Sequence, residues 1–380
     1  MPEKKPPLPK PREPLTTAGE ALAEMILQNG PVSVATFMEV AGSHYYAAKD
    51  AFGVDGDFIT APEISQMFGE MLGAWVVDAW MQMGKPDRAQ LLELGPGRGT
   101  LAADIMRTIS AWPDCKAAFS LHLVETSPLL RQKQAELLIK HQPTWYERLE
   151  DVPGGLCFVI ANEFLDALPI RQFEKTGGIW QERGIGFDAA SGSFYFTPCA
   201  ATAPVIVPPE FRNEPDGSIF EVSDASIHIM LDVAKRVAEY GGAALLVDYG
   251  HAARGIGDTL QTLHKHTFTQ VLGQPGRDDI TAHVDFVACA EAVADKVTVH
   301  GPVMQGEFLR GLGITQRAEA LGAPATDDQR KDINAALHRL VSPTAMGRLF
   351  KVLGLTAKES NIKPAGFNES DGHEVSDDGP

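Results

Sequence analysis

The segment LLELGPGRGTL contains a glycine-rich turn with an acid before it. Gly95, Gly97 and Gly99 allow the backbone to turn sharply and to approach a ligand without a clash from a Cβ atom. Such a turn also leaves N–H groups at the start of the next helix, where they bind polar or anionic ligand groups. Glu93 precedes the first glycine, and a second acid, Glu125, ends the next apolar run. This pattern predicts a site for a nucleotide or a nucleotide-like cofactor.

The spacing of this turn differs from that of a dinucleotide-binding site. A dinucleotide turn has the pattern G-x-G-x-x-G and an acid about 20 residues later. Here Thr100 stands in place of the third glycine, and Glu125 follows Gly95 by 30 residues. The turn and its acids resemble the first motif of class I S-adenosylmethionine (SAM) methyltransferases. The resemblance implies that the glycines, Glu93 and Thr100 bind SAM, and that Glu125 accepts both ribose hydroxyls with its two oxygens. A plain strand–turn–helix corner is the alternative.

Four blocks of sequence are similar to a narrower group of methyltransferases. They are GDFITAPEISQMFGE (56–70), ELGPGRGTL (93–101), ANEFLDALP (161–169) and DITAHVDF (279–286). Together they resemble the MidA-like family, whose mitochondrial members are assembly factors of respiratory complex I. The resemblance implies a SAM-dependent protein methyltransferase that symmetrically dimethylates an arginine, with a complex I core subunit or another protein as its partner. The alternatives are a methyltransferase for a small molecule or another side chain, and an assembly chaperone that binds SAM without catalysis.

Polar side chains follow the apolar run LCFVIAN, which is expected to be the fourth strand of the sheet. In class I methyltransferases the carboxyl end of this strand faces the transferred methyl. The polar side chains are Asn162, Glu163 and Asp166. Carboxylates bind the planar guanidinium group through paired hydrogen bonds. We therefore predict that Glu163 and Asp166 bind the substrate arginine, and that Asn162 orients it. His283 is predicted to accept the released proton directly or through water. The alternative for the two acids is a helix cap. Asp248 ends another strand and is expected to face the same cleft.

The first of the four blocks is predicted to form a lid over the cofactor or the substrate. Thr60, Pro62, Glu63 and Ser65 lie in it, ahead of a helix. Functional residues commonly lie in loops that a rigid scaffold holds in place. The alternative is a simple entry to the helix, in which Thr60 or Ser65 caps the first turn. No metal site is predicted, because His283 has no second histidine near it that could act as a ligand.

Short apolar strands alternate with helices from residue 89 onward. This alternation predicts an α/β fold, a parallel sheet with helices on both faces, which is the Rossmann-like fold of class I methyltransferases. We assign residues 89–170 and 223–356 to this SAM methyltransferase domain. Between them, 171–222 is predicted as a β-rich insertion on the substrate side. Residues 15–88 are predicted as an N-terminal helical lid region.

The composition argues against several partners. The formal net charge of −17 argues against nucleic acid, which binds basic surfaces. No apolar segment approaches the roughly 20 residues of a membrane helix, so no membrane insertion is expected. The four separated cysteines indicate reduced thiols. The oligomeric state stays open.

The two ends of the chain are expected to be tails. Residues 1–14 are predicted to be disordered, and 357–380 to form an acidic tail. The N-terminal residues match neither a secretory signal nor a transit peptide. We therefore expect a cytoplasmic, bacterial-type protein, although mitochondrial members of the family act in the matrix.

Overall fold

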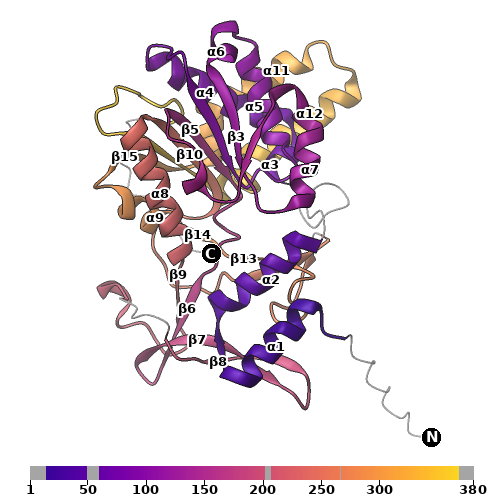
Figure 1. Ribbon diagram of the computed structural model, residues 1–380, viewed down its shortest axis with the longest axis vertical. Coiled ribbons are helices and arrows are strands. Elements are labelled where there is room, and N and C mark those ends of the chain that lie inside the picture. Colours follow the sequence, from indigo (N-terminus) through magenta and orange to yellow (C-terminus); the bar gives the residue numbers. More distant parts are fainter. Residues whose placement is uncertain (1–13, 49–59, 202–206, 266, 368–380) are drawn as a thin grey trace, which may run out of the picture.

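The protein is built around a large mixed sheet and a smaller antiparallel sheet (Figure 1). The computed structural model describes residues 14–48, 60–201, 207–265 and 267–367. Most of the predicted N-terminal tail, the start of the predicted lid up to residue 59, and the chain from 368 onward lie outside these ranges. Residues 357–367 of the predicted acidic tail are described, and among them Ile362 is buried in the core.

The large sheet has the strand order β15-β16-β10-β5-β2-β3-β4, and β14 pairs with β10. All neighbours are parallel except β16, which is antiparallel to both β10 and β15. The structure therefore confirms the predicted α/β fold, with one antiparallel strand in the sheet. The strands are β2 (Ala89–Leu94), β3 (Phe119–Val124), β4 (Thr144–Tyr146), β5 (Cys157–Asn162), β10 (Gly242–His251), β14 (Val284–Asp285), β15 (Val297–Met304) and β16 (Phe350–Ala357).

Helices cover both faces of the large sheet. Alternate residues of β5 point to opposite faces, with Phe158 and Ile160 in one apolar cluster and Val159 and Ala161 in another. The first cluster includes α4 (Gln66–Gln82), α5 (Thr100–Ser110), α6 (Pro113–Ala118), α10 (Gln305–Gly311), α11 (Ile314–Gly322) and α12 (Asp327–Val341). The second includes α8 (Asp224–Tyr240) and α9 (Phe286–Val293). Three further helices are α3 (Ala61–Ile64), α7 (Pro128–Leu137) and α13 (Met346–Leu349). In the described part of the chain, no helix combines the length and the apolar character that crossing a membrane requires.

The small sheet packs against the first two helices of the chain (Figure 1). Its strands are β1 (Val32–Ser33), β6 (Arg171–Thr176), β7 (Ile179–Asp188), β8 (Ser193–Pro198) and β9 (Ile219–Val222). The helices α1 (Thr17–Asn29) and α2 (Val34–Ala48) share an apolar cluster with it, which includes Leu22, Phe37, Ile185 and Phe194. A three-stranded sheet of β11 (Gln261–His264), β12 (Thr267–Phe268) and β13 (Asp279–Thr281) contacts α2. The segment 15–88 is thus divided between the two sheets. Its helices α1 and α2 pack on the small sheet, whereas α4 packs on α5 beside the large sheet.

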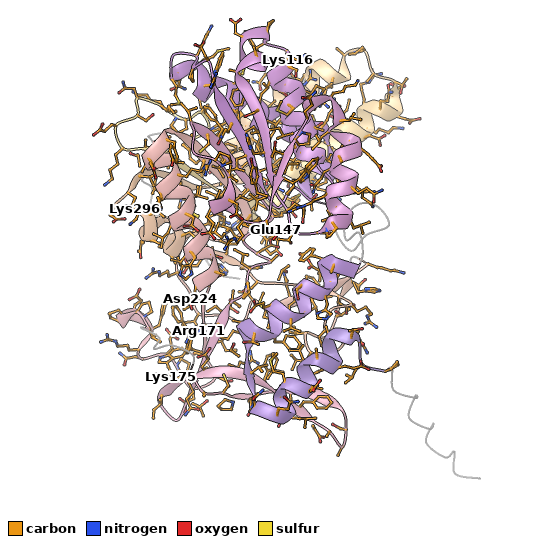
Figure 2. The ribbon with its side chains drawn as sticks, viewed as in Figure 1. Lys116, Glu147, Arg171, Lys175, Asp224 and Lys296 are labelled. Carbon is orange, nitrogen blue, oxygen red and sulfur yellow. The ribbon has the colours of Figure 1, made fainter. Side chains whose placement is uncertain are left out.

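An ion-pair network holds the small sheet where it joins the large part. Arg171 begins β6 and binds Glu182 on β7, with 2.9 Å between Nη2 and Oε2. The same guanidinium lies 3.4 Å from Asp224 at the start of α8. Figure 2 shows Arg171 and Asp224 where the two parts of the molecule meet. The predicted insertion is therefore anchored at the point where it follows β5 and precedes α8.

Candidate active site

The glycine turn joins β2 to α5 and has a backbone that requires glycine. Gly95, Gly97 and Gly99 have φ angles of 62°, 54° and 87°, all in the left-handed region. A Cβ atom on Gly95 would lie 2.7 Å from Cδ2 of Phe164, in the segment after β5. Gly99 precedes α5 at the N-cap without a side-chain cap. The first N–H groups of this helix therefore face the turn, as a bound ligand requires.

Glu93 is a buried acid on β2, directly before this turn. Its side chain is 3% exposed. The Oε2 atom is buried and has no hydrogen-bond partner among the described residues. Burial raises the pKa of Glu93 to about 8. A cationic ligand group at this place would stabilise the negative charge of the ionised Glu93. The buried Oε2 without a hydrogen-bond partner therefore fits the cationic amino-acid end of SAM.

Glu125 follows β3 with both carboxylate oxygens held by the protein. Oε1 accepts the N–H of Ser127 at 2.8 Å, and Oε2 accepts from Nε2 of Gln134 at 3.2 Å. Burial raises the pKa of Glu125. The side chain is 8% exposed and has a fixed orientation, which suits an acceptor for vicinal hydroxyl groups.

One pocket brings together most of the residues predicted from the sequence. It encloses a volume of about 30 Å³ and lies between the glycine turn, α3 and the end of β5. Its lining consists of Thr60, Pro62, Glu63, Glu93, Gly95, Pro96, Gly97, Arg98, Thr100, Leu101, Asn162 and Glu163. Cofactor, lid and catalytic candidates therefore share this pocket, although they are far apart in the sequence.

Two hydrogen-bonded carboxylates stand on different elements of the pocket. Oε1 of Glu63, on α3, accepts the hydroxyl of Thr100 at 2.6 Å. Oε1 of Glu163 accepts the N–H of Ala61 at 3.0 Å and Nδ2 of Asn162 at 3.2 Å. Through these bonds α3 is linked both to α5 and to the end of β5. The described part of the predicted lid is thus a wall of the pocket.

The alternative reading of the lid as a helix entry is also partly correct. Ser65 is the N-cap of α4, and its hydroxyl oxygen accepts the N–H of Met67 at 3.2 Å. Thr60 stands at the N-cap of α3 without a side-chain capping hydrogen bond. Ser65 therefore has a capping role, whereas Thr60 lines the pocket.

Glu163 has an unusual backbone conformation. Its φ angle is 49°, in the left-handed region that residues other than glycine rarely adopt. Loss of contact with water raises the pKa of its carboxylate to about 7. Strained backbone and a shifted pKa commonly occur at functional sites.

The carboxylates of Asp166 and Asp248 make contacts that differ from the prediction, which placed both of them at the substrate cleft with Glu163. Oδ2 of Asp166 accepts the hydroxyl of Tyr249 at 2.5 Å, and Asp166 does not line the pocket. Oδ2 of Asp248 accepts the backbone N–H groups of Phe164, Leu165 and Asp166. Burial raises the pKa of Asp166 to about 6 and that of Asp248 as well. Asp248 therefore contacts the turn after β5 instead of facing the cleft.

His283 lies outside the pocket that holds Glu163. Its ring packs edge-on to Tyr249, with 5.5 Å between the ring centroids, and lies 5.1 Å from that of His251. It lines a different cavity, together with Phe220 and Asp285. Burial lowers the pKa of His283 to about 4. His283 thus does not line the pocket that holds Glu163, and its predicted role as proton acceptor through water stays a prediction.

Sequence reasoning missed Gln134, which is fully buried and contacts the glycine turn. It lies in the polar run RQKQAEL, and nothing in that run distinguishes this glutamine from the exposed Gln132. Only the packing of α7 against the turn shows the difference between them.

Comparisons with known proteins agree with this geometry. The model of a family described as S-adenosyl-L-methionine-dependent methyltransferase matches residues 71–303. The chain is 37% identical to the mitochondrial protein arginine methyltransferase NDUFAF7 of Danio rerio, covering 92% of this chain and 91% of that protein. It is 35% identical to the mitochondrial NDUFAF7 of Homo sapiens, covering 90% of this chain and 84% of the relative.

A solved structure gives the same result for fold and cofactor. A COG1565 superfamily member from Burkholderia thailandensis, bound to S-adenosyl-homocysteine, has a TM-score of 0.74 and 26% identity, covering 92% of this chain and 95% of that one. The relatives also correct one prediction. The expected cytoplasmic location is wrong, because the similar curated proteins are named as mitochondrial. The chain belongs to the SAM-dependent methyltransferase family that includes these NDUFAF7 proteins, and it is an enzyme that uses SAM.

Proposed function

We propose that this methyltransferase acts on arginine side chains of a protein, with symmetric dimethylarginine as its product. Relatives named protein arginine methyltransferases, which align over most of the chain, support the proposal. The observation that carries it is Glu163, a left-handed residue whose carboxylate lines the pocket beside the glycine turn. The proposed substrate is a core subunit in the peripheral arm of respiratory complex I.

Glu93 and the glycine turn in the pocket, together with Glu125 outside its lining, are proposed to hold SAM, whose sulfonium supplies an electrophilic methyl group. Glu93 would bind the cationic amino-acid end through its orphaned Oε2. The backbone N–H groups between Gly95 and Thr100 would bind the polar atoms beside it. Glu125, whose oxygens are fixed by Ser127 and Gln134, would accept the ribose hydroxyls.

Glu163 and Glu63 are proposed to bind the substrate guanidinium. This group stays protonated, with a pKa above about 12, so carboxylates bind it through charge-assisted hydrogen bonds. The bonds from Ala61 and Asn162 both end on Oε1 of Glu163, and we assign its Oε2 to the substrate. Glu63 replaces Asp166 as the second carboxylate, because Glu63 lines the pocket and Asp166 does not.

Glu163 is also the proposed acceptor of the proton that the reaction releases. Substrate and product guanidinium groups are both cations, so each methyl transfer sets one proton free. A pKa of about 7 suits a group that accepts a proton near neutral pH. His283 is not retained for this step, since its pKa is lowered to about 4 and it lines another cavity.

The test uses methyl-labelled SAM and the complex I core subunit, followed by mass spectrometry of the labelled residues. We expect label on arginine as symmetric dimethylarginine. Glu163→Gln should lose this label while its SAM affinity, measured by calorimetry, stays unchanged. Glu136→Gln, which alters an exposed glutamate on α7, is the matched control and should keep full activity.

Three results would contradict the proposal. Label on lysine or on a small molecule would show a different substrate. A fully active Glu163→Gln enzyme would exclude the assigned role of that carboxylate. SAM binding without label on any cellular protein would indicate a protein that acts by contact alone.

A further inference from the structure

A fully buried glutamine joins the two ends of the cofactor site. Gln134 lies on α7, with 0% of its surface exposed. Its Nε2 donates to the carbonyl oxygen of Gly97 at 2.6 Å and to Oε2 of Glu125 at 3.2 Å. Its Oε1 accepts from Nε1 of Trp145 at 2.8 Å. The carboxamide thus uses both N–H groups and its oxygen inside the protein.

These partners permit only one orientation of the amide. If the amide were rotated by half a turn, its oxygen would face the carbonyl of Gly97, and its NH₂ group would face the indole N–H of Trp145. Both contacts would then be repulsive, and buried groups without partners cost the free energy of their lost hydration. Trp145, on β4, therefore fixes the direction in which Gln134 donates.

The same side chain packs against the glycine turn. A Cβ atom on Gly99 would lie 3.3 Å from Cγ of Gln134. The carbonyl that Gln134 binds belongs to Gly97, whose φ angle of 54° is left-handed. The other oxygen of Glu125 is held by the N–H of Ser127. One amide therefore connects the turn to a carboxylate that is already fixed at its other side.

We propose that Gln134 is a positioning residue for binding of the methyl donor. It holds the Gly97 turn and the Glu125 carboxylate at a fixed separation. The amino-acid end and the ribose of the donor can then bind at the same time, without reordering of the site. A preorganised site binds more tightly because less conformational freedom is lost on binding. The inference rests on the assignment of Glu125 to the ribose in the proposed function.

The test compares the binding of S-adenosyl-homocysteine and of its 2′-deoxy analogue, each by calorimetry. Gln134→Leu should weaken binding of S-adenosyl-homocysteine by at least about 10-fold, because its three hydrogen bonds, to Gly97, Glu125 and Trp145, are lost. It should also reduce the preference for S-adenosyl-homocysteine over the analogue, since Glu125 is no longer held. Trp145→Phe removes the indole donor but keeps an aromatic ring and both donors of Gln134, and it should cause a smaller loss in the same direction. Gln132→Leu, on the exposed side of the same helix, should bind like the wild type.

Each other outcome has a definite meaning. Wild-type affinity in Gln134→Leu overturns the inference. Equal weakening for both ligands also overturns it, because a general loss of structure would not change the preference. If Gln134→Leu does not fold, the same comparison in Trp145→Phe decides. Glu125→Ala separates the two assignments, because an unchanged preference in that variant would refute the ribose contact itself.

Discussion

Glu93 is an acid whose ionisation is unfavourable until a cation binds beside it. Burial raises its pKa from 4.5 to about 8, so the folded protein keeps a proton that the unfolded chain has lost. Because the folded state binds more protons, the free energy of unfolding should fall as the pH rises between these two values. Glu93→Gln cannot ionise and should be more stable than the wild type at pH 8 by roughly 2–4 kcal/mol, with little difference at pH 4.5.

Urea unfolding at several pH values measures this difference. In Glu93→Gln the free energy of unfolding should still fall somewhat as the pH rises, because of other groups such as Glu163, whose pKa is raised to about 7. Glu136→Gln, at an exposed position, should show the wild-type pH dependence. Saturating SAM should flatten the wild-type curve, because its positive charge favours the ionised carboxylate. An identical pH dependence in Glu93→Gln and the wild type would exclude Glu93 as the source.

At the scale of elements, β10 holds the turn that follows β5. Oδ2 of Asp248 accepts the N–H groups of Phe164, Leu165 and Asp166 at 3.1, 2.9 and 3.2 Å. These bonds fix the turn that places Glu163 in the pocket. Asp248→Ala leaves three N–H groups without this acceptor, and a small displacement of a catalytic group commonly costs about 100-fold in rate. We therefore expect turnover to fall about 100-fold, with SAM affinity within about 3-fold of the wild type.

Single-turnover transfer from labelled SAM, together with calorimetry, separates these two effects. Asp248→Asn keeps an acceptor oxygen and should recover part of the rate lost in Asp248→Ala. If Asp248→Ala turns over like the wild type, the turn holds its conformation without β10. If the SAM affinity falls as much as the rate, the effect of Asp248 extends to the cofactor site.

Elements with local signals could be predicted from the sequence, and their packing partners could not. The glycine turn was predicted because left-handed backbone requires glycine, as Gly95 and Gly97 show. The cap at Ser65 follows from the hydroxyl before a helix. In contrast, an apolar stripe shows that a helix has a buried face but does not show what covers it. For the same reason the sequence does not show that Glu63 lines the pocket and Asp166 does not.

For the whole molecule, the arrangement of the two parts depends on contacts between distant segments. The two-residue strand β1 pairs with β7 through Val32 and Ile185, and no local pattern predicts this pairing. It places α1 and α2 on the small sheet instead of in one unit with α4. The substrate-side role that the sequence predicts for the insertion would therefore involve the N-terminal helices as well as 171–222.

The ion pair between Arg171 and Glu182 offers a test of that role, which we propose for the small sheet. The Glu182 side chain is 0% exposed, so Arg171→Met removes a guanidinium from beside a buried carboxylate and should destabilise the protein by about 3–5 kcal/mol. Because Arg171 does not line the pocket of the glycine turn, SAM affinity should stay unchanged while the KM for the protein substrate rises. Adding Glu182→Gln removes the buried negative charge and should restore part of the stability. Lys296→Met, which breaks the exposed pair with Asp295, should change neither the stability nor the KM for the protein substrate. A double variant with restored stability and normal KM would show that the pair acts only on folding, whereas weakened SAM binding in Arg171→Met would show that the small sheet supports the cofactor site itself.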